Sequence, residues 1–180
     1  MQTTVQGNAA LINTLSKLCP PEGVRHTADQ YGNAQHWFEL SSPMLLVSAA
    51  AALKDAEARL SLITGYARNS APDSAEKPAA ACYHFVLDGV IYNLTATLTR
   101  EEPYVPTITS YFVNADWHER EMMELVGITV SNQPNPTRLF LNAELDPGVL
   151  KEYVPLSVMM NGACSKDLWE HILGSKEGGH

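Results

Sequence analysis

Apolar residues recur at helical intervals in two stretches of the first third of the chain. Leu11 and Leu15 belong to such a pattern over residues 8–18. It predicts an amphipathic helix, which two consecutive prolines then end. A second helix is predicted over residues 43–59, which are rich in alanine and leucine. Ser42 can cap its start, and the proline that follows suits the first helical position.

A different pattern, the alternation of β-branched and aromatic residues with polar ones, marks the middle of the chain. Predicted strands cover residues 36–40, 60–66, 82–87, 90–98 and 107–113. The third and fourth are joined by Asp88-Gly89, a dipeptide typical of two-residue hairpin turns. Residues 69–80, dominated by small residues and prolines, are predicted to be a flexible insertion. We therefore predict the α+β class, with a small, mainly antiparallel sheet of about four strands packed by helices.

Residues 115–127 combine high charge with a terminal glycine, as expected of a helix closed by a left-handed cap. Helical spacing divides their side chains into two stripes. The stripe suited to packing on the sheet consists of Ala115, His118, Met122, Leu125 and Val126. The opposite stripe consists of Trp117, Arg120, Glu121 and Glu124, with Glu119 beside it. An aromatic residue, an arginine and carboxylates on one face can dock a partner, or they can form a solvated face with local ion pairs.

Composition argues against several classes of function. Lys and Arg number 12 against 20 Asp and Glu, so the net charge is −8. That charge argues against binding to nucleic acid, which depends on neutralised phosphates, and against a polybasic membrane anchor. The first residues lack the basic start and apolar run of a secretory signal. The longest apolar stretch, residues 44–53, is too short to cross a bilayer.

The sequence offers no convincing catalytic constellation. Cys19, Cys82 and Cys164 lie far apart and are predicted to be reduced thiols. The chain has neither a Gly-x-Ser-x-Gly nucleophile motif nor a glycine-rich phosphate loop. His118 and the glutamates around it leave a second hypothesis open, a stand-alone metal-dependent enzyme. Their spacing is not that of the zinc proteases, however, and a packed histidine is the plainer interpretation.

The charged helix gives the chain its resemblance to a known family. Residues 117–121, Trp-His-Glu-Arg-Glu, followed by an acid, two apolar residues and Gly127-Ile128, are similar to the signature of the complex I 30 kDa subunit family. That family includes the equivalent subunits of membrane-bound, energy-converting nickel–iron hydrogenases. The resemblance continues through residues 133–141 and ends in residues 151–156. With weaker agreement back to Trp37, it covers roughly two thirds of the chain.

Several positions depart from the family pattern. The family's aspartate-hydrophobic-phenylalanine before the glycine is Glu124-Leu125-Val126 here, and its histidine is Gln133. One of its paired basic residues is Thr137, which leaves Arg138 alone. These departures favour a hydrogenase-type or otherwise divergent relative over the respiratory complex I subunit.

The resemblance implies a scaffold subunit rather than an enzyme. Such a subunit binds no cofactor or metal. It packs on the hydrogenase-like large catalytic subunit beside the iron–sulfur small subunit, and it meets the inner face of the cell membrane only through the complex, from the cytoplasm. An NADH–quinone oxidoreductase 30 kDa-type subunit is the alternative within this class, and a free adaptor is a third hypothesis. The expected interface residues are Trp117, Glu119, Arg120, Glu121, Glu124 and Arg138.

The predicted domain organisation has two parts. Residues 1–160 are expected to form one α+β domain that contains the signature segment 115–141, and residues 161–180 add a C-terminal helix and tail. Residues 165–174 have amphipathic spacing. That spacing suits either a helix folded back on the domain or a tail that binds a partner.

Overall fold

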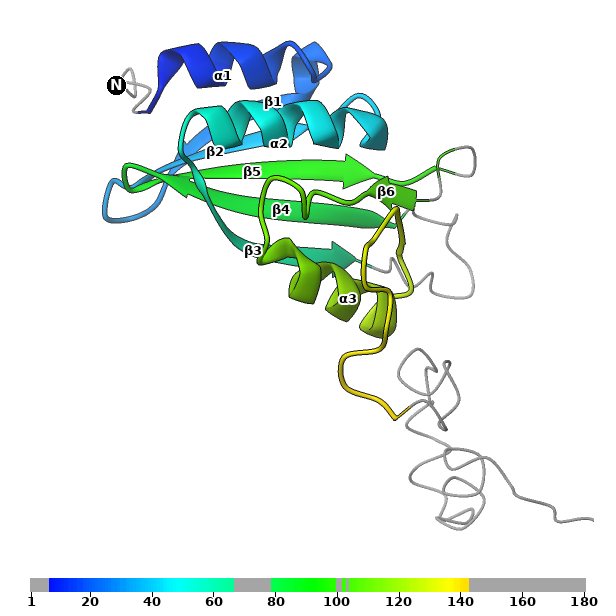
Figure 1. Cartoon of the computed structure of the whole chain (residues 1–180). Coiled ribbons are helices and arrows are strands. Elements are labelled where there is room, and N and C mark those ends of the chain that lie inside the picture. The colour runs from blue at the N-terminus through cyan, green and yellow to red at the C-terminus, as the bar shows by residue number, and fades with distance from the viewer. Residues whose placement is uncertain (1–6, 67–78, 100–101, 103, 143–180) are drawn as a thin grey trace, which may run out of the picture.

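The computed structural model describes residues 7–66, 79–99, 102 and 104–142, and Figure 1 shows their arrangement. The predicted C-terminal helix and the boundary at residue 160 lie outside these residues, as does most of the predicted insertion at 69–80. None of the helices in the described residues is long and apolar enough to cross a membrane.

A five-stranded sheet forms the centre of the fold, in the order β1-β2-β5-β4-β3. In that order its strands are β1 (Val24–Ala28), β2 (Ala34–Glu39), β5 (Val90–Thr97), β4 (Ala80–Leu87) and β3 (Arg59–Tyr66). Neighbouring strands run antiparallel except β2 and β5, which pair in parallel. The predicted α+β class with a mainly antiparallel sheet is confirmed, with one more strand in the sheet than expected.

The additional strand is β1, which the sequence pattern did not reveal. It lies at the edge of the sheet, and four of its five residues are exposed. A strand that buries neither face has no apolar alternation, so periodicity gives no signal for it. The connection to β2 is closed by Asp29, whose side chain accepts hydrogen bonds from the backbone N–H groups of Tyr31 and Asn33.

The predicted hairpin between β4 and β5 is confirmed. Asp88 and Gly89 have φ angles of 50° and 78°, and positive values at both central residues are the requirement of the type I′ turn. The turn fixes the register, which places Phe85 opposite Tyr92. Both side chains are fully buried.

The second predicted helix is confirmed but is shorter than expected. It begins with the 3-10 turn η2 (Pro43–Leu45), where the Ser42 side chain accepts a hydrogen bond from the Met44 N–H. It continues as α2 (Leu46–Asp55), and the predicted extension to residue 59 was wrong. Glu57 adopts a φ of 61°, a left-handed conformation that ends the helix and lets β3 begin at Arg59.

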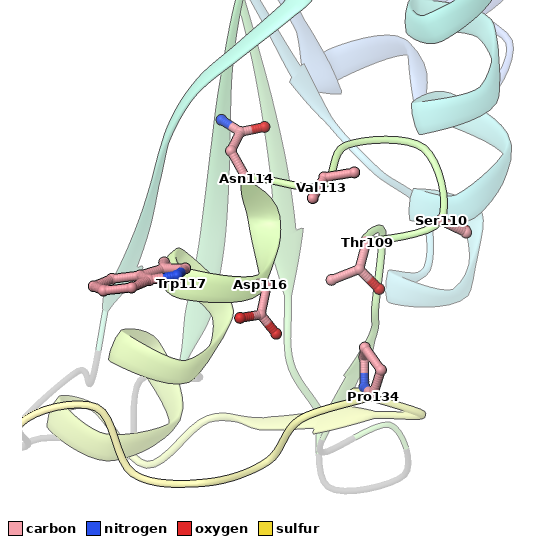
Figure 2. Close-up of a pocket in the computed structure, with 7 residues that line it drawn as sticks. All are labelled: Thr109, Ser110, Val113, Asn114, Asp116, Trp117 and Pro134. Atoms are coloured by element: carbon pink, nitrogen blue, oxygen red, sulfur yellow. The ribbon is translucent and has the colours of Figure 1, made fainter.

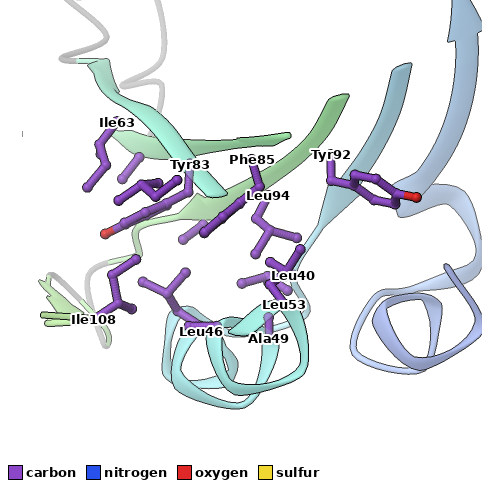
Figure 3. Packing of buried hydrophobic residues seen from close by; sticks show 14 of the residues in the cluster. Leu40, Leu46, Ala49, Leu53, Ile63, Tyr83, Phe85, Tyr92, Leu94 and Ile108 are labelled. Atoms are coloured by element: carbon purple, nitrogen blue, oxygen red, sulfur yellow. The ribbon is translucent and has the colours of Figure 1, made fainter. Parts of the chain in front are cut away.

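Helix α2 covers one face of the sheet and closes the apolar core (Figure 3). Leu46, Ala49 and Leu53 lie on its inner side and are completely buried. They face the sheet residues Tyr83, Phe85 and Leu94. Removing a large apolar side chain from water contributes roughly 1.5–3 kcal/mol, so this layer dominates the stability of the fold.

The first predicted helix is α1 (Ala9–Ser16), which lies beside α2 and adds Leu11 and Leu15 to the core. The side chain of Asn8 caps its start by accepting a hydrogen bond from the Leu11 N–H. The two prolines that follow the helix lead into the 3-10 turn η1 (Pro21–Gly23), as their restricted φ angles favour.

Residues 107–113, predicted as a strand, form turns instead. The strand in this region is β6 (Tyr104–Pro106), which pairs in parallel with the unpredicted β7 (Thr129–Ser131). The N–H groups of Tyr111 and Phe112 both donate to the carbonyl of Ile108. The prediction was wrong because these backbone groups are satisfied locally and need no sheet neighbour.

The predicted charged helix is confirmed as α3 (Ala115–Leu125), and Gly127 after it has the expected left-handed φ of 78°. The helix packs against β3 (Figure 1). Gly65 allows this close approach: a Cβ atom there would lie 2.8 Å from Cγ of Met122 and 3.0 Å from Cγ2 of Val126. The last described segment, residues 132–142, runs along α3 and is held by its side chains.

Candidate functional site

Glu119, predicted to lie beside the exposed stripe of α3, points into the protein and is completely buried. One carboxylate oxygen accepts hydrogen bonds from Oγ1 of Thr107 at 2.6 Å and Nε2 of Gln133 at 2.9 Å. The other accepts the backbone N–H of Ile108 at 2.8 Å. One side chain therefore ties α3 to the turn after β6 and to the segment after β7.

Burial raises the pKa of the Glu119 carboxyl, and the negative charge of Asp116 adds to that rise. The donors on Thr107, Ile108 and Gln133 act in the opposite direction but do not cancel it. Close by, the fully buried hydroxyl of Tyr83 has no hydrogen-bond partner within the described residues. Burial raises the pKa of Tyr83 well above its usual value, with Glu119 as a further cause, so this hydroxyl stays neutral.

The Arg120 side chain also forms hydrogen bonds within its own chain. Its Nε donates to the carbonyl of Thr137 at 2.8 Å. One terminal nitrogen donates to the hydroxyl of Thr137 and to the carbonyl of Arg138, both at 3.1 Å. The other lies 3.4 Å from a carboxylate oxygen of Asp116. Because the guanidinium is planar and has five N–H donors, one side chain can donate hydrogen bonds to two successive peptide carbonyls.

Glu124 holds the same segment one turn further along the helix. Its carboxylate accepts three consecutive backbone N–H groups, those of Leu139 at 2.7 Å, Phe140 at 2.9 Å and Leu141 at 2.7 Å. Burial by itself would raise the pKa of Glu124. The three backbone donors and the positive charge of Arg138 outweigh burial, and the net shift is downward.

We call Glu119, Arg120 and Glu124 together the α3 clamp. The prediction that Glu119 and Glu124 lie on or beside an exposed stripe was wrong, since they are 0% and 8% exposed. Helical periodicity assigned them to the surface because it treats charge as solvated. Their partners lie 11 to 17 positions away in the sequence, and many are backbone groups. Sequence reasoning also missed Thr107, for which no local pattern gives a signal, and it singled out Gln133 only as a departure from the family pattern, not as a partner of Glu119.

The side of α3 that does face solvent carries an apolar surface. Trp117 is 64% exposed and Val113, just before the helix, is 84% exposed. They border an open groove of about 780 Å³, which we call the α3 groove (Figure 2). Its lining consists of Thr109, Ser110, Val113, Asn114, Asp116, Trp117 and Pro134.

The remaining predicted interface residues, Glu121 and Arg138, lie nearer the surface. The Glu121 side chain is 40% exposed and its carboxylate is 3.8 Å from Nδ1 of His118. Nη1 of Arg138 donates to the carbonyl of Asn142 at 3.1 Å. Leu125, expected to pack on the sheet, is 38% exposed and lines a smaller pocket between α3 and β3.

The described residues contain no group of three or more His, Cys, Asp or Glu side chains arranged to hold a metal ion. Cys19 and Cys82 are free thiols. Burial raises the pKa of Cys19 to about 11, with the charge of Glu39 as a second cause, so that thiol stays protonated and poorly nucleophilic.

A family model and the curated relatives of this chain both name a subunit of the same respiratory enzyme. Residues 41–163, more than half of the chain, match the family described as "Respiratory-chain NADH dehydrogenase, 30 Kd subunit". The C/D subunit of NADH-quinone oxidoreductase from Shewanella oneidensis is 42% identical over 48 residues, which are 27% of this chain and 8% of that protein. The C subunit of the same enzyme from Streptomyces coelicolor is 29% identical over 99 residues, or 53% of this chain and 39% of that protein. The matched segments thus span less than half the length of these curated relatives.

A solved structure shares the fold. It is the structure of the membrane-bound sulfane sulfur reductase, an archaeal respiratory membrane complex, and one of its chains superimposes with a TM-score of 0.56. The alignment covers 84% of this chain and 88% of that chain at 12% identity. The similarity is therefore one of architecture.

Proposed function

Because the chain belongs to the family of the respiratory-chain NADH dehydrogenase 30 kDa subunit, we propose that it is a non-catalytic scaffold subunit of a larger oxidoreductase. The complex is a membrane-bound, energy-converting nickel–iron hydrogenase or a related complex I-like assembly. The chain docks the hydrogenase-like large subunit next to the iron–sulfur small subunit. It reaches the inner face of the cell membrane only through them, from the cytoplasmic side.

The observation that carries this proposal is that the charged and the aromatic side chains of α3 have different surroundings. The clamp residues are engaged with the chain's own loops, while Trp117 projects into solvent at the rim of the α3 groove. Tryptophan is the residue most enriched among side chains that dominate binding energy at interfaces. A large aromatic left exposed beside an apolar groove marks a surface that a partner covers.

The engagement of the carboxylates also favours a scaffold over an acid–base enzyme. Both oxygens of Glu119 and both of Glu124 accept hydrogen bonds from the chain itself. A general base must instead lie within hydrogen-bond reach of a substrate proton. His118 lies 3.8 Å from Glu121, and within the described part of the chain no third ligand joins these two to hold a catalytic metal.

The departures from the family pattern favour the hydrogenase-type complex, and two of them contact the clamp. Gln133 stands where the family usually has histidine, and it donates to Glu119. Thr137 stands where the family has a basic residue, and both its carbonyl and its hydroxyl accept from Arg120. At two positions that contact the clamp, this chain thus carries a side chain of different chemistry from the usual family residue.

A second candidate is the 30 kDa-type subunit of an NADH–quinone oxidoreductase. It is favoured by the names of the curated relatives, which are the C and C/D subunits of that enzyme. The two candidates differ in the metal content of the large subunit that the chain docks, because only the hydrogenase would carry nickel there.

The test is a mild-detergent affinity purification of the tagged full-length chain from its native cells, followed by mass spectrometry and metal analysis. The proposal predicts that large and small redox subunits co-purify, with nickel and iron in those subunits. The same subunits without nickel would indicate the NADH–quinone candidate. A chain that purifies alone and carries its own metal, lost in His118→Ala, would overturn the scaffold proposal.

A matched pair of variants locates the docking surface in the same experiment. Trp117→Ala should lower the recovery of the large subunit, because it removes the aromatic anchor. Tyr31→Ala is the control, since Tyr31 is an aromatic residue of similar exposure, 81%, between β1 and β2. Equal recovery in the two variants would remove Trp117 from the interface.

A further inference from the structure

The geometry points to an arginine-bearing loop of the large subunit as the occupant of the α3 groove, with the guanidinium packed on Trp117 and paired with Asp116. This inference rests on the proposed function, since it names the chemistry by which the scaffold recognises its partner. It goes beyond that function because it assigns a charge and a shape to the docking segment.

The walls of the groove suit a chain segment rather than a small molecule. At about 780 Å³ the groove is larger than any single side chain requires, and its main apolar walls, Trp117 and Val113, are 64% and 84% exposed. Pockets for small ligands bury most of the ligand's surface. A broad groove with such open walls instead matches a loop that brings its own apolar atoms to cover them.

The negative charge in the α3 groove comes from Asp116. Figure 2 shows the carboxylate of Asp116 between Trp117 and Pro134. One of its oxygens lies 3.4 Å from a terminal nitrogen of Arg120, a long contact, since Arg120 directs its shorter hydrogen bonds to the 137–138 backbone. Among the described residues, the second oxygen of Asp116 has no hydrogen-bond partner. It is free to accept a charged donor from outside.

Arginine fits this pair of groups better than lysine does. Its planar guanidinium can stack on an indole and donate two parallel hydrogen bonds to a carboxylate, while the ammonium of lysine is compact and strongly hydrated. The chain already contains one guanidinium–indole contact, since the guanidinium carbon of Arg25 lies 5.4 Å from the ring centre of Trp37. The net charge of −8 favours a basic partner as well.

Charge substitutions at one position test the inference in the full-length chain, purified with its complex from native cells. Asp116→Lys should lower the recovery of the large subunit at least about tenfold, which corresponds to losing one good charge-assisted contact. Asp116→Asn, nearly the same in shape, should lower it several-fold, and Asp116→Glu should retain most of it. Asp55→Lys is the control, because it makes the same charge change at an exposed position on α2.

Thermal unfolding of each full-length variant separates docking from folding. Asp116→Asn should unfold within a few degrees of the wild type, so that a loss of recovery reports the interface. A photo-crosslinking amino acid at Val113 should then couple to a large-subunit peptide that contains arginine.

The outcomes distinguish a failure of the arginine inference from a failure of the proposed function. If Trp117→Ala loses the large subunit while Asp116→Lys recovers as much as Asp55→Lys, the groove takes a neutral loop; the arginine inference is overturned and the scaffold proposal stands. A crosslink to a peptide without basic residues has the same consequence. If the wild-type chain recovers no large subunit at all, the proposed function fails and the inference fails with it.

Discussion

The layer between α2 and the sheet and the layer around α3 are both buried, but different chemistry holds them together. The first is apolar, with Leu46, Leu53, Tyr83 and Phe85 completely excluded from water. The second is built on the α3 clamp, in which Glu119 and its neighbours bind backbone groups of two loops. Apolar packing is non-directional and tolerant, whereas the clamp is directional and fails when one partner is lost.

This difference assigns distinct roles to the two layers. The apolar layer contributes strongly to the free energy of folding through its completely buried side chains. The clamp fixes the turn at residues 107–109 and the segment at 133–141, which border the α3 groove through Thr109 and Pro134. The charged residues of the clamp thus hold the loops that border the α3 groove, and uncharged side chains provide its exposed walls.

The largest effect is expected in the apolar layer. Phe85→Ala should lower the free energy of unfolding by about 3–5 kcal/mol, because it opens a cavity between the sheet and Phe112, whose ring centre lies 5.1 Å away. Urea unfolding followed by circular dichroism measures this. A loss below about 1 kcal/mol would mean that the core repacks around the site.

Glu119→Ala should rank second, with a loss of about 2–4 kcal/mol, since it leaves two buried donors and one partly buried donor without this acceptor. Glu119→Gln keeps the shape and one carbonyl oxygen and should cost less than Glu119→Ala in the same unfolding experiment. If both variants unfold like the wild type, the buried carboxylate has no structural role and the comparison between the two layers collapses.

Gly65→Ala tests the junction between α3 and the sheet. The added Cβ would lie 2.8 Å from Cγ of Met122, so α3 must move or Met122 must change rotamer. The expected loss is about 1–3 kcal/mol, and the double variant with Met122→Ala should recover part of it by making room. A double variant less stable than the sum of the two single changes would refute this steric explanation.

The smallest expected effect is on the pH dependence of stability, in which Glu119 and Glu124 should act in opposite directions. The pKa of Glu124 lies below its ordinary value of 4.5, so its contribution to stability is present above that pH and is lost as pH falls through the folded-state pKa. The pKa of Glu119 is raised above 4.5, so its contribution is largest below that pH and diminishes as pH rises through the folded-state pKa. Urea unfolding of wild type, Glu119→Gln and Glu124→Gln between about pH 4 and pH 7 should show differences of opposite slope.

Sequence patterns predicted what is local and periodic. The Asp88-Gly89 hairpin, the helix cap at Ser42 and the glycine that ends α3 each depend on a few adjacent residues. The edge strand β1 was missed because it has no buried face, and β7 because it spans only three residues. The direction in which the α3 charges point was predicted wrongly for a related reason. Their hydrogen bonds join a helix to distant backbone groups, and no periodicity records such a bond.

Among the predicted interface residues, Trp117 and Glu121 have the exposure that a docking role needs. The aromatic residue was singled out by its position on the helix, and the structure adds the groove beside it. Arg120, also expected at the interface, donates instead to the backbone carbonyls of Thr137 and Arg138 of its own chain. A docking role for the six residues as a set stays a prediction.

The most direct test of the clamp is amide hydrogen exchange in the full-length chain without any partner, comparing wild type with Glu124→Gln. We expect the amides of Leu139, Phe140 and Leu141 to be protected in the wild type by the Glu124 carboxylate. They should exchange at least about tenfold faster in the variant, since each loses a charge-assisted hydrogen bond, while the amides of the β4–β5 hairpin keep their rates. Unchanged exchange at 139–141 would contradict the claim that the signature charges hold the chain's own loops.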